Sequence, residues 1–337
     1  MKRNKIIVAF SLCLSLFYCS LIYCNKNVTA AELERLNVVY STIATASLTT
    51  WVPMEAGIYK KYGLDVNAIY VAGAQAITTL ISGDAQIAQA SGAAGVFSRL
   101  AGSEVTIIGA IINVIPMSLV ATPDITGPKD LKGKTLGVSR FGSLTDLGLK
   151  KAIAELGLDP AKDIKLIQTG GVPENFLFMQ QGVIKAALIS SPALEKAKEM
   201  GYKELLNLAD IKFRYPGTAL LTTDSFIRNR PQTLNRFLKA TLEGIRYAKT
   251  NPEFTMGIMG KYLRVSDKRS LASAFRTYVL GYIRDVPTIT STEIGAALEE
   301  ISVRSPKARD ADPKQFYDPN PLEQLAKEGF IKEIYGR

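Results

Sequence analysis

The chain has 337 residues, of which 47% are hydrophobic and 21% are charged, so it can bury a large core and is not disordered as a whole. It contains no histidine, and its three cysteines, Cys13, Cys19 and Cys24, all lie near the N-terminus. Imidazole chemistry is therefore excluded, and residues 25–337 offer no thiolate, disulfide or cysteine-ligated metal site. We expect no catalytic residue, no cofactor and no metal.

The first 30 residues have the pattern of an export signal. Three basic residues within the first five precede an uncharged apolar run over residues 6–24. Val28 and Ala30 then supply the small side chains that a signal peptidase requires. We predict that residues 1–30 are a signal peptide cleaved after Ala30 and that the mature protein is periplasmic or otherwise extracytoplasmic.

Two alternatives for this segment stay open. The apolar run is long enough to span a bilayer as an uncleaved anchor. Cys24 could instead be lipidated, although Tyr23 stands where the lipoprotein-processing enzyme prefers Gly, Ala or Ser. All three interpretations place the rest of the chain outside the cytoplasmic membrane.

The basic charge is modest once the signal is removed. The formal net charge of +10 falls to +6, because Lys2, Arg3, Lys5 and Lys26 leave with the signal and no acidic residue does. No arginine-rich run with interleaved aromatic residues follows. We therefore expect a solvated basic surface and no nucleic-acid partner.

Short strands and helices alternate after residue 31. The pattern predicts strands at residues 36–40, 64–71 and 85–90, with one helix after Pro53 and another at 76–82. The same order returns with strands at 136–139, 164–168 and 186–190 and helices at 147–156 and 176–181. This order is typical of a parallel sheet covered by helices.

Individual residues repeat together with these elements. Ser47-Leu48-Thr49 corresponds to Ser143-Leu144-Thr145, and Gly63-Leu64-Asp65 corresponds to Gly157-Leu158-Asp159. We therefore predict an α/β protein with two similar α/β lobes, whose parallel-rich sheets are joined by a two-strand hinge. Lobe I comprises residues 31–117 plus 219–337, with the C-terminal helices, and lobe II comprises residues 118–218.

The hinge is expected at residues 113–122 and 214–223, which are extended, apolar and interrupted by proline. Beyond it, apolar periodicity predicts helices at 234–248, 271–283, 290–303 and 322–335. Thr290 and Glu293 have the spacing of a capping box for the third of these helices.

Five short strings in a fixed order carry a family resemblance. They are EAGIYKKYGLDV (55–66), ISGDAQIA (81–88), DLKGKTLGV (130–138), QQGVIKAA (180–187) followed by Pro192, and NP (251–252). Together they resemble the periplasmic solute-binding proteins of nitrate/sulfonate/taurine-type ABC importers. The resemblance implies a type II periplasmic binding fold that closes on a small solute and delivers it to an ABC transporter permease. One departure is Lys185, which stands where the family has Asp in the second lobe's Gly-x-x-Asp-Ala turn.

The turns after the strands supply the candidate ligand-binding residues. Two-lobed α/β proteins bind ligands between the carboxyl ends of their facing sheets, and a helix N-terminus there favours an anion. The candidates are Thr42, Ser47, Thr49, Gly73, Gln75, Ser91, Arg140, Gly142, Ser143, Thr145, Pro173, Glu174, Ser191 and Arg214. Each hydroxyl could instead cap its own helix. Glu174 could equally serve a cationic ligand, so the ligand's charge stays open, with an anionic or heteroatom-rich organic solute favoured.

Two other classes of function are weighed against transport. Relatives of this fold that make a thiamin pyrimidine precursor depend on a histidine and a cysteine-rich segment, and this chain has neither. A hydrolase that uses carboxylates alone, or a ligand-sensing module for a separate receptor, are the remaining alternatives. We expect a monomer that is not an enzyme.

Overall fold

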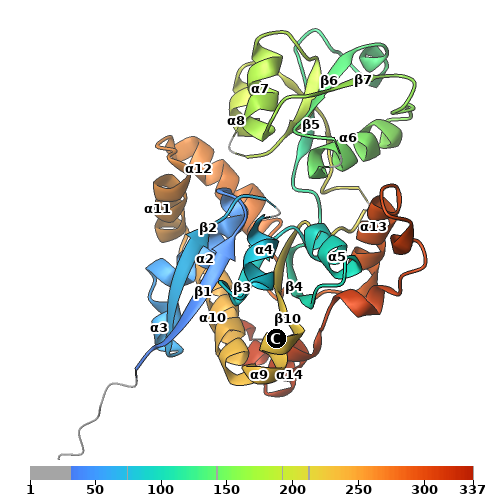
Figure 1. Cartoon of the computed structure of the whole chain (residues 1–337). Helices are drawn as coiled ribbons and strands as arrows, with labels where there is room; N and C mark the ends of the chain where they lie inside the picture. Colours follow the sequence, from blue (N-terminus) through green and yellow to red (C-terminus); the bar gives the residue numbers. More distant parts are fainter. Residues whose placement is uncertain (1–31, 74, 142, 192, 212, 337) are drawn as a thin grey trace, which may run out of the picture. The chain divides into compact units, whose positions relative to one another are not determined.

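Two five-stranded sheets with matching strand order form the framework of the protein (Figure 1). The structure is a computed structural model, and it describes residues 32–336 apart from 74, 142, 192 and 212. The predicted signal peptide lies outside the described residues. The chain divides into two units, Met1–Glu34 and Arg35–Arg337, and everything below concerns the second, apart from Glu34 at the start of the first strand.

The first sheet has the order β2-β1-β3-β10-β4. Its strands are β1 (Glu34–Tyr40), β2 (Leu64–Tyr70), β3 (Ile87–Ala90), β4 (Val105–Ile112) and β10 (Thr218–Thr223). β1 is parallel to β3, with Val38 opposite Ile87, whereas β10 is antiparallel to both β3 and β4. The first sheet is therefore parallel-rich with one reversed strand.

The second sheet repeats this arrangement in the order β7-β6-β8-β5-β9. Its strands are β5 (Ser118–Ala121), β6 (Thr135–Val138), β7 (Lys165–Gln168), β8 (Ala186–Ile189) and β9 (Lys203–Asn207). β6 is parallel to β7 and β8, and β5 is antiparallel to β8 and β9. Each strand occupies the position of its counterpart in the first sheet, so the predicted α/β fold of two similar lobes is confirmed.

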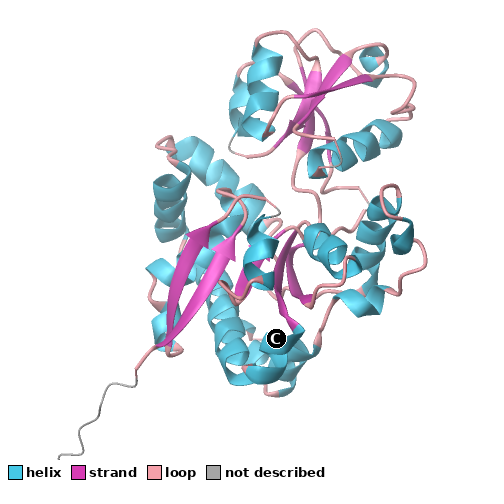
Figure 2. Cartoon of the chain, viewed as in Figure 1, coloured by secondary structure: helices cyan, strands magenta, loops and turns pink. Residues whose placement is uncertain are grey.

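Helices flank each sheet (Figure 2). Between strands of the first sheet the chain forms α2 (Leu48–Glu55), α3 (Ile58–Lys61), α4 (Gln75–Ile81) and α5 (Gly92–Leu100). Between strands of the second sheet it forms α6 (Leu144–Glu155), α7 (Val172–Gln180) and α8 (Ala193–Glu199). The C-terminal part contains α9 (Asp224–Asn229), α10 (Pro231–Thr250), α11 (Pro252–Leu263), α12 (Lys268–Ala274), α13 (Ser291–Ser302), α14 (Asn320–Lys327) and α15 (Phe330–Tyr335). In the described part of the chain, no helix is both long enough and apolar enough to cross a membrane.

Several predicted boundaries differ from the structure. The helix predicted after Pro53 begins earlier, at Leu48, and Pro53 lies inside it. The helix predicted at 322–335 is divided in two, because Gly329 adopts a left-handed conformation with φ +81°. The helix predicted at 271–283 is α12 continued by a π-helix, η3 (Phe275–Leu280). The capping box of Thr290 and Glu293 is confirmed at the start of α13.

The repeat extends beyond the predicted elements. α5 and β4 in the first lobe correspond to α8 and β9 in the second, and none of these four was predicted. α5 contains two glycines, Gly92 and Gly95, which weaken its helical signal because glycine has a low helix propensity. Gly95 is needed there because a Cβ atom would lie 2.2 Å from Cδ2 of Leu221 on β10. The helix packs closely against the sheet at this point.

Two crossings connect the sheets, one at residues 113–117 and one at 208–217. They run side by side, since the Tyr215 amide donates a hydrogen bond to the Asn113 carbonyl oxygen at 2.9 Å. β5 begins at the end of the first crossing and β10 at the end of the second. The lobe boundaries predicted from the sequence, 117/118 and 218/219, lie within one residue of the first residues of β5 and β10. The division into lobes stays a prediction.

Lys185 takes part in an ion pair that the family's Asp could not make. Its Nζ lies 3.0 Å from Oδ2 of Asp124, in the segment after β5. A hydrogen bond from Thr122 and the pairing with Lys185 lower the pKa of Asp124 from 3.8 to about 2. The substitution in the family pattern is thus matched by a carboxylate partner.

This pair predicts a measurable titration. A carboxylate with a lowered pKa stabilises the fold above its unfolded pKa, and that contribution is lost as the pH falls from about 4 to about 2. Lys185→Met should raise the pKa of Asp124 while leaving it below 3.8, because the Thr122 hydrogen bond is retained. NMR titration would measure it, with Lys165→Met on β7 as the control. An unchanged pKa in Lys185→Met would contradict the assignment.

Candidate functional site

A cavity of about 720 Å³ opens at the carboxyl ends of the strands of both sheets. Ser41 directly follows β1, Gly73 lies in the turn after β2, and Ser91 directly follows β3. Arg140 and Ser143 reach the same cavity from the turn after β6. Four of the predicted binding residues, Gly73, Ser91, Arg140 and Ser143, therefore share one cavity with Ser41, at the edge of the sheets where ligands of open α/β folds bind.

The rest of the lining comes mainly from helices. The further residues are Ile77, Thr78, Ile81, Ala93, Ala94, Phe97, Ser98, Ala101, Phe141, Leu144, Tyr215, Glu300 and Arg304. α4, α5 and the residue directly after α5 supply the positions from Ile77 to Ala101, Glu300 lies on α13, and Arg304 lies in the turn directly after α13. The cavity is thus enclosed by the first lobe, by the β6–α6 turn and by one crossing.

The β6–α6 turn is held in shape by hydrogen bonds. The Ser143 amide donates to the Arg140 carbonyl at 3.1 Å, and the Phe141 amide donates to Oε1 of Gln168 at 2.9 Å. Gly142, which is also a predicted binding residue, lies outside the described residues. The turn presents both Arg140 and Phe141 as exposed side chains.

Three hydroxyl groups meet at the start of α6. The hydroxyls of Ser139, Ser143 and Thr145 lie 2.8–3.0 Å from one another. The Ser139 amide donates to Oγ1 of Thr145 at 2.8 Å, and Oγ of Ser143 accepts from the Asp146 amide at 3.4 Å. Thr145 is buried and anchors the strand end, whereas half-buried Ser143 faces the cavity.

A charged cluster lies where the cavity meets the crossing. The Tyr215 hydroxyl donates to one carboxylate oxygen of Glu300 at 2.6 Å, and the Arg304 guanidinium lies 3.3 Å from the other. Burial raises the pKa of Glu300, although the hydrogen bond from Tyr215 and the charge of Arg304 oppose this. Sequence reasoning missed all three residues; the spacing of Glu300 and Arg304 on a helix was the one available signal.

Arg140 differs from Arg304 in its surroundings. Among the described residues, Arg140 has no ion-pair partner, and its side chain is exposed. The lining therefore carries two guanidinium groups against one carboxylate. Its net positive charge favours an anionic ligand.

The structure places other predicted residues in the protein core. Oε1 of the buried Gln89 accepts hydrogen bonds from Thr49 at 3.1 Å and Thr50 at 2.5 Å, and its amide donates to the Ala46 carbonyl at 2.7 Å. The buried Ser47 hydroxyl donates to a backbone carbonyl at 2.6 Å. These hydroxyls stabilise the start of α2 and do not line the cavity.

The remaining predicted residues lie elsewhere around the turns. Those outside the cavity lining are Thr42, Gln75, Pro173, Glu174, Ser191 and Arg214. All except Ser191 are exposed. The Ser191 hydroxyl donates to Oε1 of Glu195 on α8 at 2.7 Å, and the same oxygen accepts from Ser273 on α12 at 3.3 Å. Ser191 is therefore part of a polar contact between helices of the two lobes.

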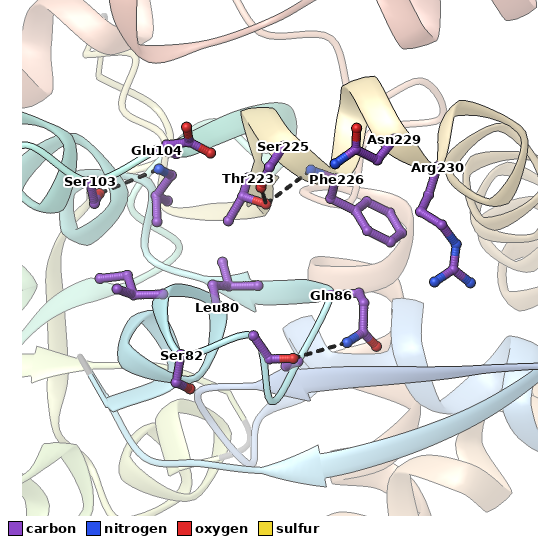
Figure 3. A pocket seen from close by; sticks show the side chains of 14 residues that line it. Leu80, Ser82, Gln86, Ser103, Glu104, Thr223, Ser225, Phe226, Asn229 and Arg230 are labelled. Carbon is purple, nitrogen blue, oxygen red and sulfur yellow. Dashed lines mark hydrogen bonds between the residues drawn. The ribbon is translucent and has the colours of Figure 1, made fainter.

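A second pocket, of about 500 Å³, lies at the opposite ends of the strands of the first sheet (Figure 3). Gln86 precedes β3, and Ser103 and Glu104 precede β4. Thr223 lies at the end of the antiparallel β10, where its hydroxyl accepts from the Phe226 amide at 3.2 Å. Since all its residues come from one lobe and from the amino ends of the parallel strands, closure of the lobes would not affect it. The first cavity is therefore the candidate site between the lobes.

Metal ligands were not expected from the sequence. Among the described residues, no three Asp, Glu, His or Cys side chains gather in a way that could hold a metal ion. The absence of metal and cofactor stays a prediction.

Residues 46–255 match the model of the family described as NMT1/THI5 like. A Brucella abortus (strain 2308) protein named only as a binding protein is 26% identical over 254 residues, covering 73% of this chain and 76% of the relative. The periplasmic aliphatic sulphonate binding protein SsuA from Escherichia coli has a similar structure, with a TM-score of 0.70 at 16% identity, covering 86% of this chain and 99% of that one. The periplasmic nitrate-binding protein NrtA from Synechocystis PCC 6803 gives a TM-score of 0.68 at 12% identity, covering 88% and 89%. The TM-scores establish a shared fold, and together with the family match they confirm the resemblance found in the sequence.

Two matched substitutions test whether the hydroxyls of Thr145 and Ser143 contribute unequally to the stability of the fold. Thr145→Val should lower the free energy of unfolding by about 2 kcal/mol, because it leaves the Ser139 amide without its acceptor. Ser143→Ala should cost about 1 kcal/mol or less, because its hydrogen bond to the Asp146 amide is long. Urea denaturation would measure both. Equal losses would show that the two hydroxyls share one structural role.

Proposed function

The chain belongs to the NMT1/THI5-like family, and from that premise we propose that it is the extracytoplasmic solute-binding component of an ABC importer. Its ligand is a small organic anion that binds in the cavity at the carboxyl ends of the strands. The observation that carries this proposal is the net positive lining, drawn from both lobes and from the crossing between them. An arginine on each side of one cavity can bind the same carboxylate or sulfonate.

Ligand capture follows from the two crossings. A ligand that contacts both lobes favours their closed arrangement by its difference in affinity for the two states. Arg140 lies on lobe II, whereas Ser91 and Arg304 belong to lobe I as predicted. An anion held between them links the lobes, and the permease then receives the solute from the closed form.

The enzyme alternative has less support. The one carboxylate of the cavity lining, Glu300, already accepts hydrogen bonds from Tyr215 and Arg304. A general base must reach a proton of the substrate, and here both oxygens are occupied. The relatives and solved structures described above are binding proteins, which agrees with a transport role.

Binding and closure are tested with 1-butanesulfonate as the probe. Calorimetry should detect binding, and small-angle scattering should show a smaller radius of gyration at saturation. Arg140→Met should raise the Kd about tenfold or more, because a charge-assisted hydrogen bond contributes about 1.5–3 kcal/mol. Arg246→Met, on the exposed face of α10, should bind like the parent. Binding without any change in scattering would argue against closure.

Export is tested at the N-terminus. We expect protein recovered from the native envelope to begin at Ala31, because the small residues at Val28 and Ala30 direct cleavage there. N-terminal sequencing and intact mass measure this directly. An intact Met1, or a lipid on Cys24, would replace a free extracytoplasmic protein with one attached to the membrane.

A further inference from the structure

The C-terminal helix α13 contacts both of the crossings that connect the two lobes. Nδ2 of Asn113, which directly follows β4, donates a hydrogen bond to Oε1 of Glu293 at 3.1 Å. The Tyr215 hydroxyl, in the second crossing, donates to Oε2 of Glu300 at 2.6 Å. Glu293 and Glu300 are about two helical turns apart, so they lie on the same face of α13. One face of one helix therefore holds both crossings.

The contact with Asn113 lies where the first sheet holds the chain least firmly. β4 is an edge strand, so its end is paired with another strand of the sheet, β10, on one side only. On the other side the Arg284 amide donates to the Ile111 carbonyl at 3.0 Å, and the Glu293 carboxylate accepts from Asn113. Residues from beyond the repeat thus fix the start of the first crossing to lobe I.

Glu293 is well suited to hold the chain in this way. It is 4% exposed, and its second carboxylate oxygen accepts from the Thr290 amide at 3.2 Å as part of the capping box of α13. Burial alone would raise the pKa of Glu293, but hydrogen bonds from Thr290 and Asn113 and the charge of Arg284 outweigh it and lower that pKa. A charged carboxylate accepts a stronger hydrogen bond than a neutral group does.

Asn113 and Tyr215 are also joined to each other, by the backbone hydrogen bond between the crossings. The two crossings and α13 therefore form one connected unit on the side of lobe I. A different contact joins lobe II itself to lobe I, because Nδ2 of Asn207, at the end of β9, donates to the Tyr282 hydroxyl at 3.0 Å. That bond must change when the lobes move, whereas the two contacts of α13 need not.

We propose that α13 is a brace for the hinge, and that Glu293, Glu300, Asn113 and Tyr215 are positioning residues for closure of the lobes. Both crossings leave lobe I in fixed directions, so the lobes move by bending on the lobe II side of Asn113 and Tyr215. This role rests on the proposed binding function and adds the element that limits the movement. A braced hinge adopts fewer open arrangements, so a larger fraction of the molecules can close on a solute.

The distance between the lobes, measured by double electron–electron resonance, tests the brace. Residues 25–337 contain no cysteine, so spin labels on Lys60→Cys in lobe I and Lys162→Cys in lobe II, both exposed positions, have no competing site there. Asn113→Ala and Tyr215→Phe should each broaden the distribution of distances in the ligand-free protein, because each releases one crossing from α13. The double variant should broaden it further.

The affinity for 1-butanesulfonate, measured by calorimetry, is the second readout. Asn113 does not line the ligand cavity, so its substitution acts on binding through the hinge. Asn113→Ala should raise the Kd about threefold or more, because a smaller fraction of the molecules has the arrangement that binds. Tyr215 does line the cavity, and Tyr215→Phe is therefore judged by the distances alone.

Two matched controls lose a similar contact away from the crossings. Tyr317→Phe removes a hydroxyl that lies 3.1 Å from Oγ of Ser291 on α13, and Asn67→Ala removes the hydrogen bond to Asn37 between β2 and β1. Both should keep the parent's distribution of distances. Urea denaturation would confirm that every variant is folded.

The outcomes separate the brace from the binding function. If Asn113→Ala and Tyr215→Phe keep the parent's distances, or if the controls broaden them equally, the brace is wrong and the binding function stands. If the parent binds 1-butanesulfonate with no change in the distance between the lobes, closure and the brace are both contradicted. The ligand-free distances need no solute, so they decide on the brace even if this sulfonate does not bind.

Discussion

Each sheet is completed by a strand that the chain makes only after crossing from the other lobe. β10 lies between β3 and β4, and β5 lies between β8 and β9, both antiparallel to their neighbours. Each crossing therefore runs from an edge strand of one sheet, β4 or β9, to an interior strand of the other, β5 or β10. This constraint fixes one end of each crossing firmly, because hydrogen-bonded ladders on both sides hold the starts of β5 and β10 in place.

The composition of the cavity follows from that anchoring. Crossings at one end of both sheets bring together the turns after the parallel strands, where backbone amides and short polar side chains gather. Tyr215 lies in a crossing and also contacts Glu300 on α13, so the polar lining and the bending region share a residue.

The sequence allowed the fold to be predicted because its repeat is periodic, whereas the site depends on tertiary contacts. Ser91, Arg140 and Ser143 were identified from the turns that carry them, since a strand followed by a helix fixes where that turn lies. Ser47 and Thr49 occupy the same positions in the repeat as Ser143 and Thr145. The Thr49 hydroxyl, however, donates a hydrogen bond to the buried Gln89, which is distant in sequence, and Thr49 therefore lies in the core. Glu300 lies on the C-terminal helix α13 and Arg304 in the turn after it, both outside the repeat, so no internal comparison pointed to them.

The central position of β10 also sets an order of assembly. Lobe II can complete its sheet from one continuous stretch of chain, residues 118–207, whereas β3 and β4 have no strand between them until β10 is made. Until then their inner edges present unpaired amides and carbonyls, which are templates for association with other chains. A chaperone that holds the chain extended until β10 has been made would protect those edges. β10 must pair with β3 and β4, which lie more than 100 residues earlier in the chain, and this pairing requires closure of a long loop. We therefore expect lobe I to fold more slowly than lobe II.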